Sequence, residues 1–176
     1  MSLESRQFGL WLLVLAWSAV LCHRDWRERR LPNLWTLGGA ATVLLARLAW
    51  GGVPSLLSGF AAAAAGGLFL LLPFLARGAG GGDVKMLFAA GAVAGWTQIL
   101  PLLLYTAFAG LGVAVALLMA GRVDGARLRH CGRCLVDFRY DRQAGRATLP
   151  SKDSEQARVP FSFAIALGLL AVTWPF

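Results

Sequence analysis

Charged residues are scarce in this chain, and their scarcity excludes the commonest class of protein. Only 15% of the 176 residues are Asp, Glu, Lys or Arg, whereas 57% are hydrophobic. A soluble globular domain has about 25% charged and about 45–50% apolar residues. The composition therefore predicts an integral membrane protein that lies in the lipid bilayer, and the length favours a single domain over residues 1–176.

Acidic residues are absent from the long apolar runs, which we interpret as six transmembrane helices. The predicted spans are Phe8–Cys22, Leu34–Trp50, Leu56–Ala76, Met86–Leu100, Pro101–Ala120 and Pro160–Phe176. Helices are expected because lipid requires every backbone polar group to be satisfied internally. Pro101 is expected to break the apolar stretch that surrounds it. Glu4 precedes Arg6 ahead of the first run, so the basic region of a signal peptide is missing, and we expect a retained span.

Basic residues are confined mostly to three polar segments, which would all lie on one side of a six-span bundle. These segments are 23–33, 77–85 and 121–159. The positive-inside rule then predicts that they are cytoplasmic and that both termini are outside. Topology thereby explains the net charge of +8 without a nucleic-acid partner. Arg47 lies near the predicted outer end of the second span, and we expect its side chain to reach outward beside Trp50.

Two aspartates, Asp25 and Asp83, lie at the edges of apolar runs, on the face predicted to be cytoplasmic. If the first and fourth spans are neighbours, the two carboxyl groups can share one water molecule. One carboxylate would take a proton from that water, and the other carboxylic acid would donate a hydrogen bond to a scissile carbonyl. Gly80, Gly81 and Gly82 precede Asp83, and they would let an extended substrate lie against this loop.

Other readings of these residues remain open. Each aspartate could be only a helix-flanking charge beside basic residues, and the glycine stretch could be an ordinary turn. Lys85 would either bias the local potential or lie at the level of the lipid headgroups. Pro32 and Asn33 predict the start of the second span.

Three segments of the chain resemble, in order, the blocks of the prepilin peptidases, the type IV leader peptidases, which are membrane aspartic proteases. The segments are Asp25-Trp-Arg-Glu-Arg-Arg-Leu-Pro-Asn33, Gly80-Gly-Gly-Asp83-Val-Lys85 and Val159-Pro-Phe-Ser-Phe-Ala-Ile-Ala-Leu-Gly168. The second is similar to the family's Gly-x-Gly-Asp motif. The resemblance implies that Asp25 and Asp83 are the catalytic pair and that no cofactor is needed. The neighbouring residues of these blocks would bind substrate or support the loop.

The resemblance also implies a substrate and a location. The chain would cleave the short basic leader peptide of type IV prepilins or pseudopilins at the cytoplasmic face of the bacterial inner membrane, in a type IV pilus or type II secretion system. Larger family members add a cytoplasmic loop with two Cys-x-x-Cys pairs, in a region linked to N-methylation. This chain looks like the compact, peptidase-only forms that serve tight-adherence pili. The rival functions are a small transporter and a non-catalytic assembly subunit.

The segment 121–159 is the only substantial polar stretch, and it is predicted to be a cytoplasmic insert before the last span. Its candidate zinc ligands are His130, Cys131 and Cys134. Cys22 or His23 is a conceivable fourth ligand, but a structural zinc site usually has two clear ligand pairs, so we favour an unmetallated Cys-x-x-Cys. The insert is either a solvated linker, which we favour, or a hairpin that caps the active site.

Overall fold

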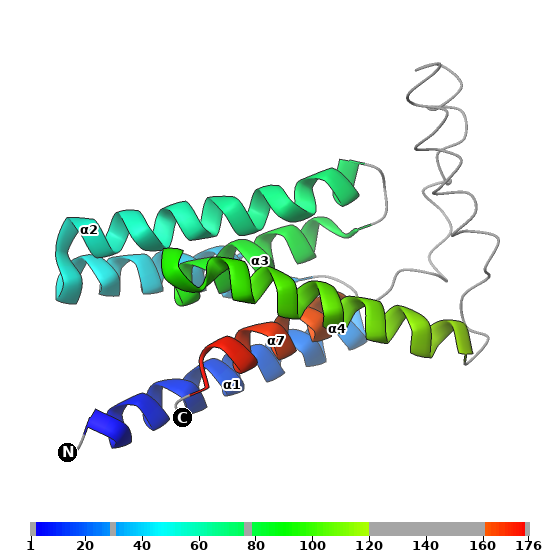
Figure 1. Ribbon diagram of the computed structural model, residues 1–176, viewed down its shortest axis with the longest axis horizontal. Coiled ribbons are helices and arrows are strands. Elements are labelled where there is room, and N and C mark those ends of the chain that lie inside the picture. Colours follow the sequence, from blue (N-terminus) through cyan, green and yellow to red (C-terminus); the bar gives the residue numbers. More distant parts are fainter. Residues whose placement is uncertain (1–2, 29–30, 76–78, 120–160, 175–176) are drawn as a thin grey trace.

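The computed structural model describes residues 3–28, 31–75, 79–119 and 161–174, and every secondary-structure element in these ranges is helical (Figure 1). In chain order the elements are α1 (Leu3–Glu28), α2 (Asn33–Leu75), α3 (Gly81–Ala94), the 3-10 turn η1 (Trp96–Gln98), α4 (Ile99–Met119) and α7 (Phe161–Val172). The prediction of an all-α fold is confirmed for this part of the chain, and the predicted insert at 121–159 lies outside the described residues.

Among the described residues, three helical stretches are long and apolar enough to cross a membrane: Phe8–Glu28, Asn33–Leu75 and Trp96–Ala116. Large apolar side chains on them face outward; Leu13, Leu45 and Phe108 are each more than 60% exposed. A surface of this kind suits contact with lipid and would be a liability in water. The chain is therefore a membrane protein, although α3 and α7 are shorter than the spans predicted for those regions.

Helix α1 continues beyond Cys22, where the sequence predicted its end, to Glu28. The added turns are rich in Arg and Glu, which are good helix formers, and Arg24 and Glu28 form an ion pair one turn apart at 4.0 Å. Asp25 consequently lies inside the stretch Phe8–Glu28, so the prediction that no acidic residue falls within a span is wrong at this position.

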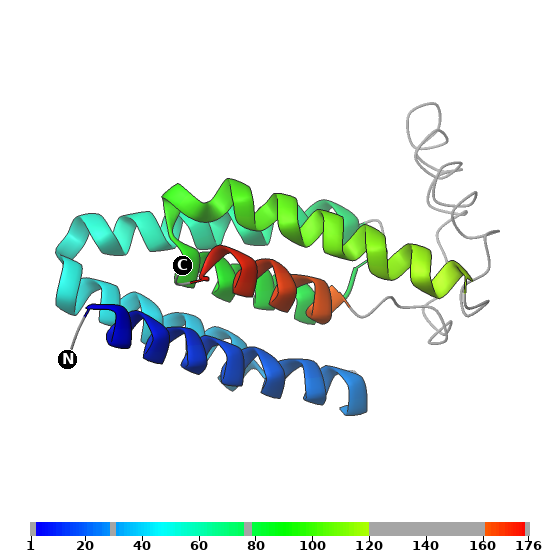
Figure 2. The same ribbon diagram turned by 60° about the horizontal axis from the view of Figure 1, so that its bottom comes forward.

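Helix α2 is two helices joined at a kink. A straight helix of 43 residues would be about 65 Å long, more than twice the thickness of the hydrocarbon core. Gly52 breaks the helix with a φ of 67°, a conformation that other residues rarely adopt. The limbs at 33–51 and 53–75 double back on each other (Figure 2), which confirms the turn predicted from Gly-Gly-Val-Pro.

The break between the next two helices occurs at Gly95, and not at Pro101 as the sequence predicted. Gly95 has a φ of 79°, and the short turn η1 connects it to α4. Pro101 is the third residue of α4. Proline has no backbone N–H, but the N–H groups in the first turn of a helix make no intrahelical hydrogen bond. Proline is therefore accepted there without a kink.

Glycines bring the helices into close contact. An added Cβ at Gly91 of α3 would lie 2.5 Å from the carbonyl oxygen of Ala62 in α2. At Gly168 of α7 it would lie 2.9 Å from the backbone nitrogen of Thr106 in α4. Contacts this short require glycine, and they are the usual way in which helices associate without a hydrophobic driving force in lipid.

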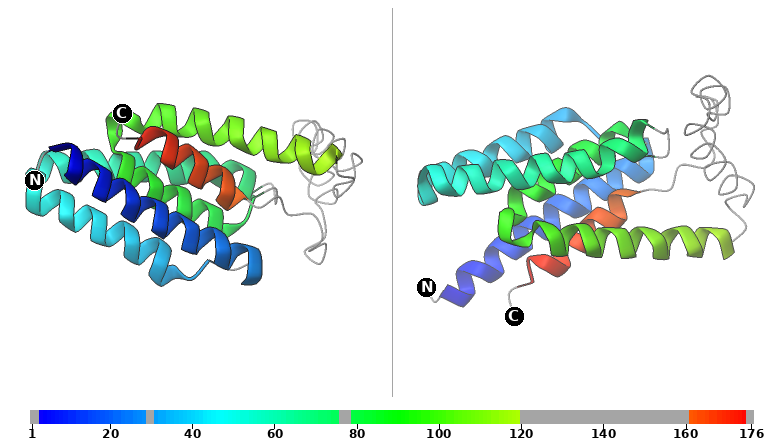
Figure 3. Two further views of the ribbon diagram at one scale, coloured as in Figure 1. Left: turned by 90° about the horizontal axis from the view of Figure 1, so that it is seen from below. Right: turned by 45° about the horizontal axis from the view of Figure 1, so that its top comes forward.

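Helix α7 contacts α1, α3 and α4, so it holds the bundle together (Figure 3). Helix α1 ends, and α3 and α7 begin, at one end of the bundle, which we call the site end (Figure 1). Both limbs of α2 also reach the site end, because the kink at Gly52 lies at the opposite end. The two chain termini lie away from the site end, near each other, as Trp11 and Trp174 pack edge to face.

Candidate active site

Asp25 lies in the last turn of α1 and is held by the first turn of α7. Its Oδ2 accepts a hydrogen bond from the hydroxyl of Ser162, with 2.5 Å between the oxygens. Trp26, the next residue, packs edge to face on Phe163 with 6.2 Å between ring centroids. The carboxyl group is half-buried, and two adjacent residues of α7 fix the helix turn that carries it.

Asp83 lies in the first turn of α3 and is held by its own helix. Its Oδ2 accepts a hydrogen bond from the backbone N–H of Gly80, the N-cap residue, at 3.1 Å. A carboxylate in this position satisfies a donor that would otherwise lack an intrahelical partner, and it interacts favourably with the helix dipole. Only 8% of the residue is exposed, so the helix terminus positions a nearly buried acid.

The glycine stretch before Asp83, which was expected to be a loop, is partly helical. Gly80 is the N-cap of α3, while Gly81 and Gly82 are already helical. A Cβ on Gly82 would lie 3.1 Å from the side chain of Leu31, in the segment that joins α1 to α2. At least one of these glycines therefore permits close packing of two chain segments, which is a different role from giving an extended substrate room.

Lys85 and Asn33 connect α3 to the start of α2. The Lys85 ammonium donates a hydrogen bond to Asn33 Oδ1 at 2.7 Å, a contact that the sequence did not predict. Helix α2 begins at Asn33, as predicted, and the carbonyl of Pro32 accepts from the backbone N–H of Trp35 at 3.1 Å. Pro32 and Asn33 therefore set the start of α2 and tie it to the turn that contains Asp83.

These contacts bring both aspartates to the site end, although they are far apart in the sequence. Asp25 precedes the segment that contains Leu31 and Asn33, and Asp83 belongs to the turn that packs on that segment. Helix α7 contacts both α1 and α3 (Figure 3). In the described interactions one oxygen of each carboxyl group accepts a hydrogen bond. The sharing of one water molecule between the two acids stays a prediction.

Arg47 is a residue whose partner the sequence did not reveal. It was expected to reach outward beside Trp50, but its guanidinium donates to the carbonyls of Ala92 and Val93, each at 2.8 Å. These carbonyls lie in the last turn of α3, where four such groups lack intrahelical partners. A cation there also complements the negative end of the helix dipole. Arg47 thereby fixes the end of α3 opposite Asp83.

No metal site is present among the residues that the structure describes, where no three His, Cys, Asp or Glu side chains gather. The zinc candidates His130, Cys131 and Cys134 lie outside the described residues. Cys22, considered as a fourth ligand, is buried in α1 and lies against the hydroxyl of Ser162, while His23 is exposed.

Comparison with known proteins identifies a family. The model of the type IV leader peptidase family matches residues 12–115, a range that contains Asp25 and Asp83 and ends before α7. Searches of curated proteins and of solved structures found no significant match. Because the family match covers more than half of the sequence, the chain belongs to the type IV leader peptidase family.

Proposed function

We propose that the chain is an aspartic endopeptidase that removes the short basic leader peptide from type IV prepilins or pseudopilins. Asp25 and Asp83 form the acid/base pair. Cleavage takes place at the cytoplasmic face of the bacterial inner membrane, both termini lie outside, and the products serve a pilus or secretion system. One observation supports this best: the C-terminus of α1 and the N-terminus of α3 both lie at the site end, and each carries an aspartate that accepts a hydrogen bond.

The chemistry needs only the two acids and water. One carboxylate takes a proton from water as the oxygen attacks the scissile carbonyl carbon, and the other carboxylic acid donates its proton to the carbonyl oxygen. The tetrahedral intermediate then collapses: the C–N bond breaks as the leaving nitrogen receives a proton from one acid, and a hydroxyl group of the intermediate returns a proton to the other, which restores the pair. Holding each carboxyl group in a helix turn reduces the reorganisation that the reaction requires.

The position of the acids disfavours the rival reading as a carrier. Within the described ranges, Asp25 lies in the last turn of α1 and Asp83 in the first turn of α3. A proton or cation carrier is expected to have acidic groups near the middle of its spans. A non-catalytic assembly subunit would not need two acids, each fixed by a donor, at one end of the bundle.

The test is leader removal in cells that co-express the chain with a panel of prepilin-type substrates, each with a short basic leader ahead of an apolar helix. We expect Asp25→Asn and Asp83→Asn each to slow cleavage by at least about 100-fold, because general acid/base catalysis supplies about that much. Glu28→Gln is the matched control, since Glu28 is an exposed acid on the same turn of α1. Full activity of either Asp variant, or failure of the parent to cleave any substrate, would contradict the proposal.

A further inference from the structure

Ser162 contacts a proposed catalytic acid but has no part in the proposed mechanism. It is the second residue of α7, it is fully buried, and it lies outside the range of the family match. Its hydroxyl donates to Oδ2 of Asp25. Among the described residues, Ser162 is the hydrogen-bond partner of Asp25, so one hydroxyl sets the orientation of that carboxyl group.

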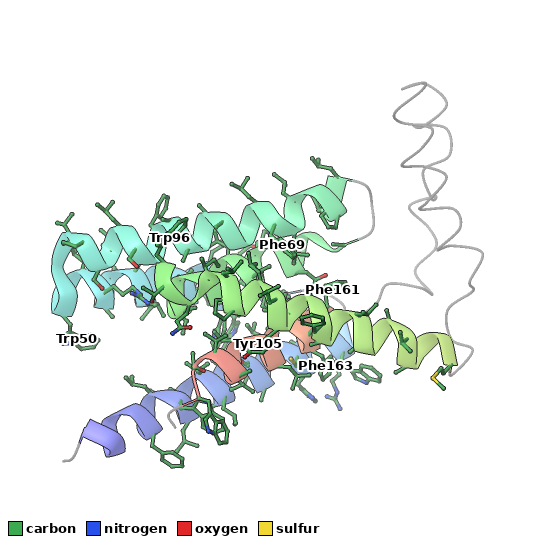
Figure 4. All side chains as sticks on the ribbon, viewed as in Figure 1. Trp50, Phe69, Trp96, Tyr105, Phe161 and Phe163 are labelled. Carbon is green, nitrogen blue, oxygen red and sulfur yellow. The ribbon has the colours of Figure 1, made fainter. Side chains whose placement is uncertain are left out.

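The neighbours of Ser162 fix the direction of its hydroxyl. Phe161 and Phe163 flank it and point toward different helices (Figure 4): Phe161 packs against Gly110 of α4, and Phe163 packs against Trp26 of α1. This pair of contacts prevents α7 from rotating about its axis. The turn at Ser162 is therefore held against α1 at the level of Asp25.

Asp25 needs such a donor because of its place in α1. A carboxylate near the C-terminus of a helix meets the negative end of the helix dipole, which disfavours the negative charge. Asp83 has the opposite situation, since an N-terminus and the N–H of Gly80 favour its charge. Asp83 receives its hydrogen bond from the N-cap of its own helix, α3. Asp25 on α1 receives a comparable hydrogen bond from Ser162 on another helix, α7.

We infer that Ser162 is a positioning residue for Asp25: by engaging Oδ2, its hydroxyl fixes the rotation of the carboxyl group and leaves Oδ1 as the oxygen that exchanges a proton with water or the substrate. This inference rests on the proposed function. Ser162 itself does not contact the scissile bond. Its removal should therefore change the rate of the chemical step and leave substrate binding unchanged.

The test compares Ser162→Ala, Ser162→Thr and Ser18→Ala with the parent, as purified full chains cleaving the best prepilin-type substrate of the panel. Ser162→Ala is expected to lower kcat about 10- to 100-fold with KM unchanged, because the hydrogen bond that orients the Asp25 carboxyl group is lost. Ser162→Thr retains the donor and is expected to restore most of kcat. Ser18 is the matched control, since it is a buried serine of α1 whose hydroxyl has no partner among the described residues.

Several results would overturn the inference. They are an unchanged kcat in Ser162→Ala, a rise in KM alone, an equal loss in Ser18→Ala, or a Ser162→Thr variant that folds as the parent does and restores nothing. The unfolding midpoint of each preparation is measured alongside, and a lower midpoint with unchanged kcat per folded molecule would show a merely structural role. Asp25→Asn in the same assay separates the two proposals. If it stays active, the proposed function fails; if it is inactive while Ser162→Ala is fully active, only the role of Ser162 fails.

Discussion

Replacing Gly91 by Ala tests whether close contact between α2 and α3 holds the bundle together. The added Cβ would lie 2.5 Å from the oxygen and 2.8 Å from the carbon of the Ala62 carbonyl, and 2.9 Å from the Cα of Ala63. All three are backbone atoms, so no side-chain rotation can relieve the clash and the helices must move apart. Overpacking of this kind costs about 1–3 kcal/mol, against a gain of about 1 kcal/mol in helix propensity. We expect a net destabilisation of up to about 2 kcal/mol.

Gly112→Ala is the matched control, because a Cβ at Gly112 has nothing within 4 Å. Only the gain in helix propensity applies there, so we expect stabilisation by about 0.5–1 kcal/mol. The measurement is unfolding in mixed micelles with increasing SDS, followed by helical circular dichroism. Gly91→Ala should also lower proteolytic activity, since α3 carries Asp83. If Gly91→Ala is as stable as Gly112→Ala, helix contact through glycine is not what stabilises this bundle.

Three hydrogen bonds at the ends of α3 give further predictions. Arg47→Met should destabilise the protein by about 2–3 kcal/mol in the same unfolding assay, because a charged donor to two carbonyls is lost, and Arg47→Lys should lose roughly half as much. A loss below about 0.5 kcal/mol for Arg47→Met would contradict this role. Lys85→Met and Asn33→Ala should each lower the free energy of unfolding by about 0.5–1.5 kcal/mol, because each removes the hydrogen bond between these two side chains. The double variant should lose no more than the larger of the two single losses, since the same hydrogen bond is removed in all three variants. Additive losses would show that the two side chains act separately.

The sequence could predict the features that depend on local chemistry. Gly52 turns the chain because only glycine readily adopts its φ, and Pro32 with Asn33 starts α2 because both residues suit a helix N-terminus. The end of α1 was misplaced because Arg and Glu mark a membrane boundary and are also good helix formers. Hydropathy reports where apolar residues end, and a helix can continue past that point.

The partners of Arg47 and Ser162 could not be predicted, because each lies on a distant segment. Arg47 binds backbone carbonyls that come 45 and 46 residues later in the chain. Every residue has a backbone carbonyl, so the sequence does not show which of them accepts the hydrogen bond. Ser162 contacts Asp25 across 137 residues. Only the packing of α7 between other helices brings this pair together. The two aspartates could be singled out because ionisable residues at the edges of apolar runs are candidates for function, and their catalytic role stays a prediction.

Helix α3 has 14 residues and is held at both ends by hydrogen bonds. Lys85 binds Asn33 near its N-terminus, and Arg47 binds its C-terminal carbonyls. A stiff rod transmits displacement along its length, so a shift at the Gly95 tip becomes a shift of Asp83. A change in lipid thickness would thus act mechanically on an acid about 20 Å away. The rate of hydrolysis would then depend on forces applied at the opposite membrane surface.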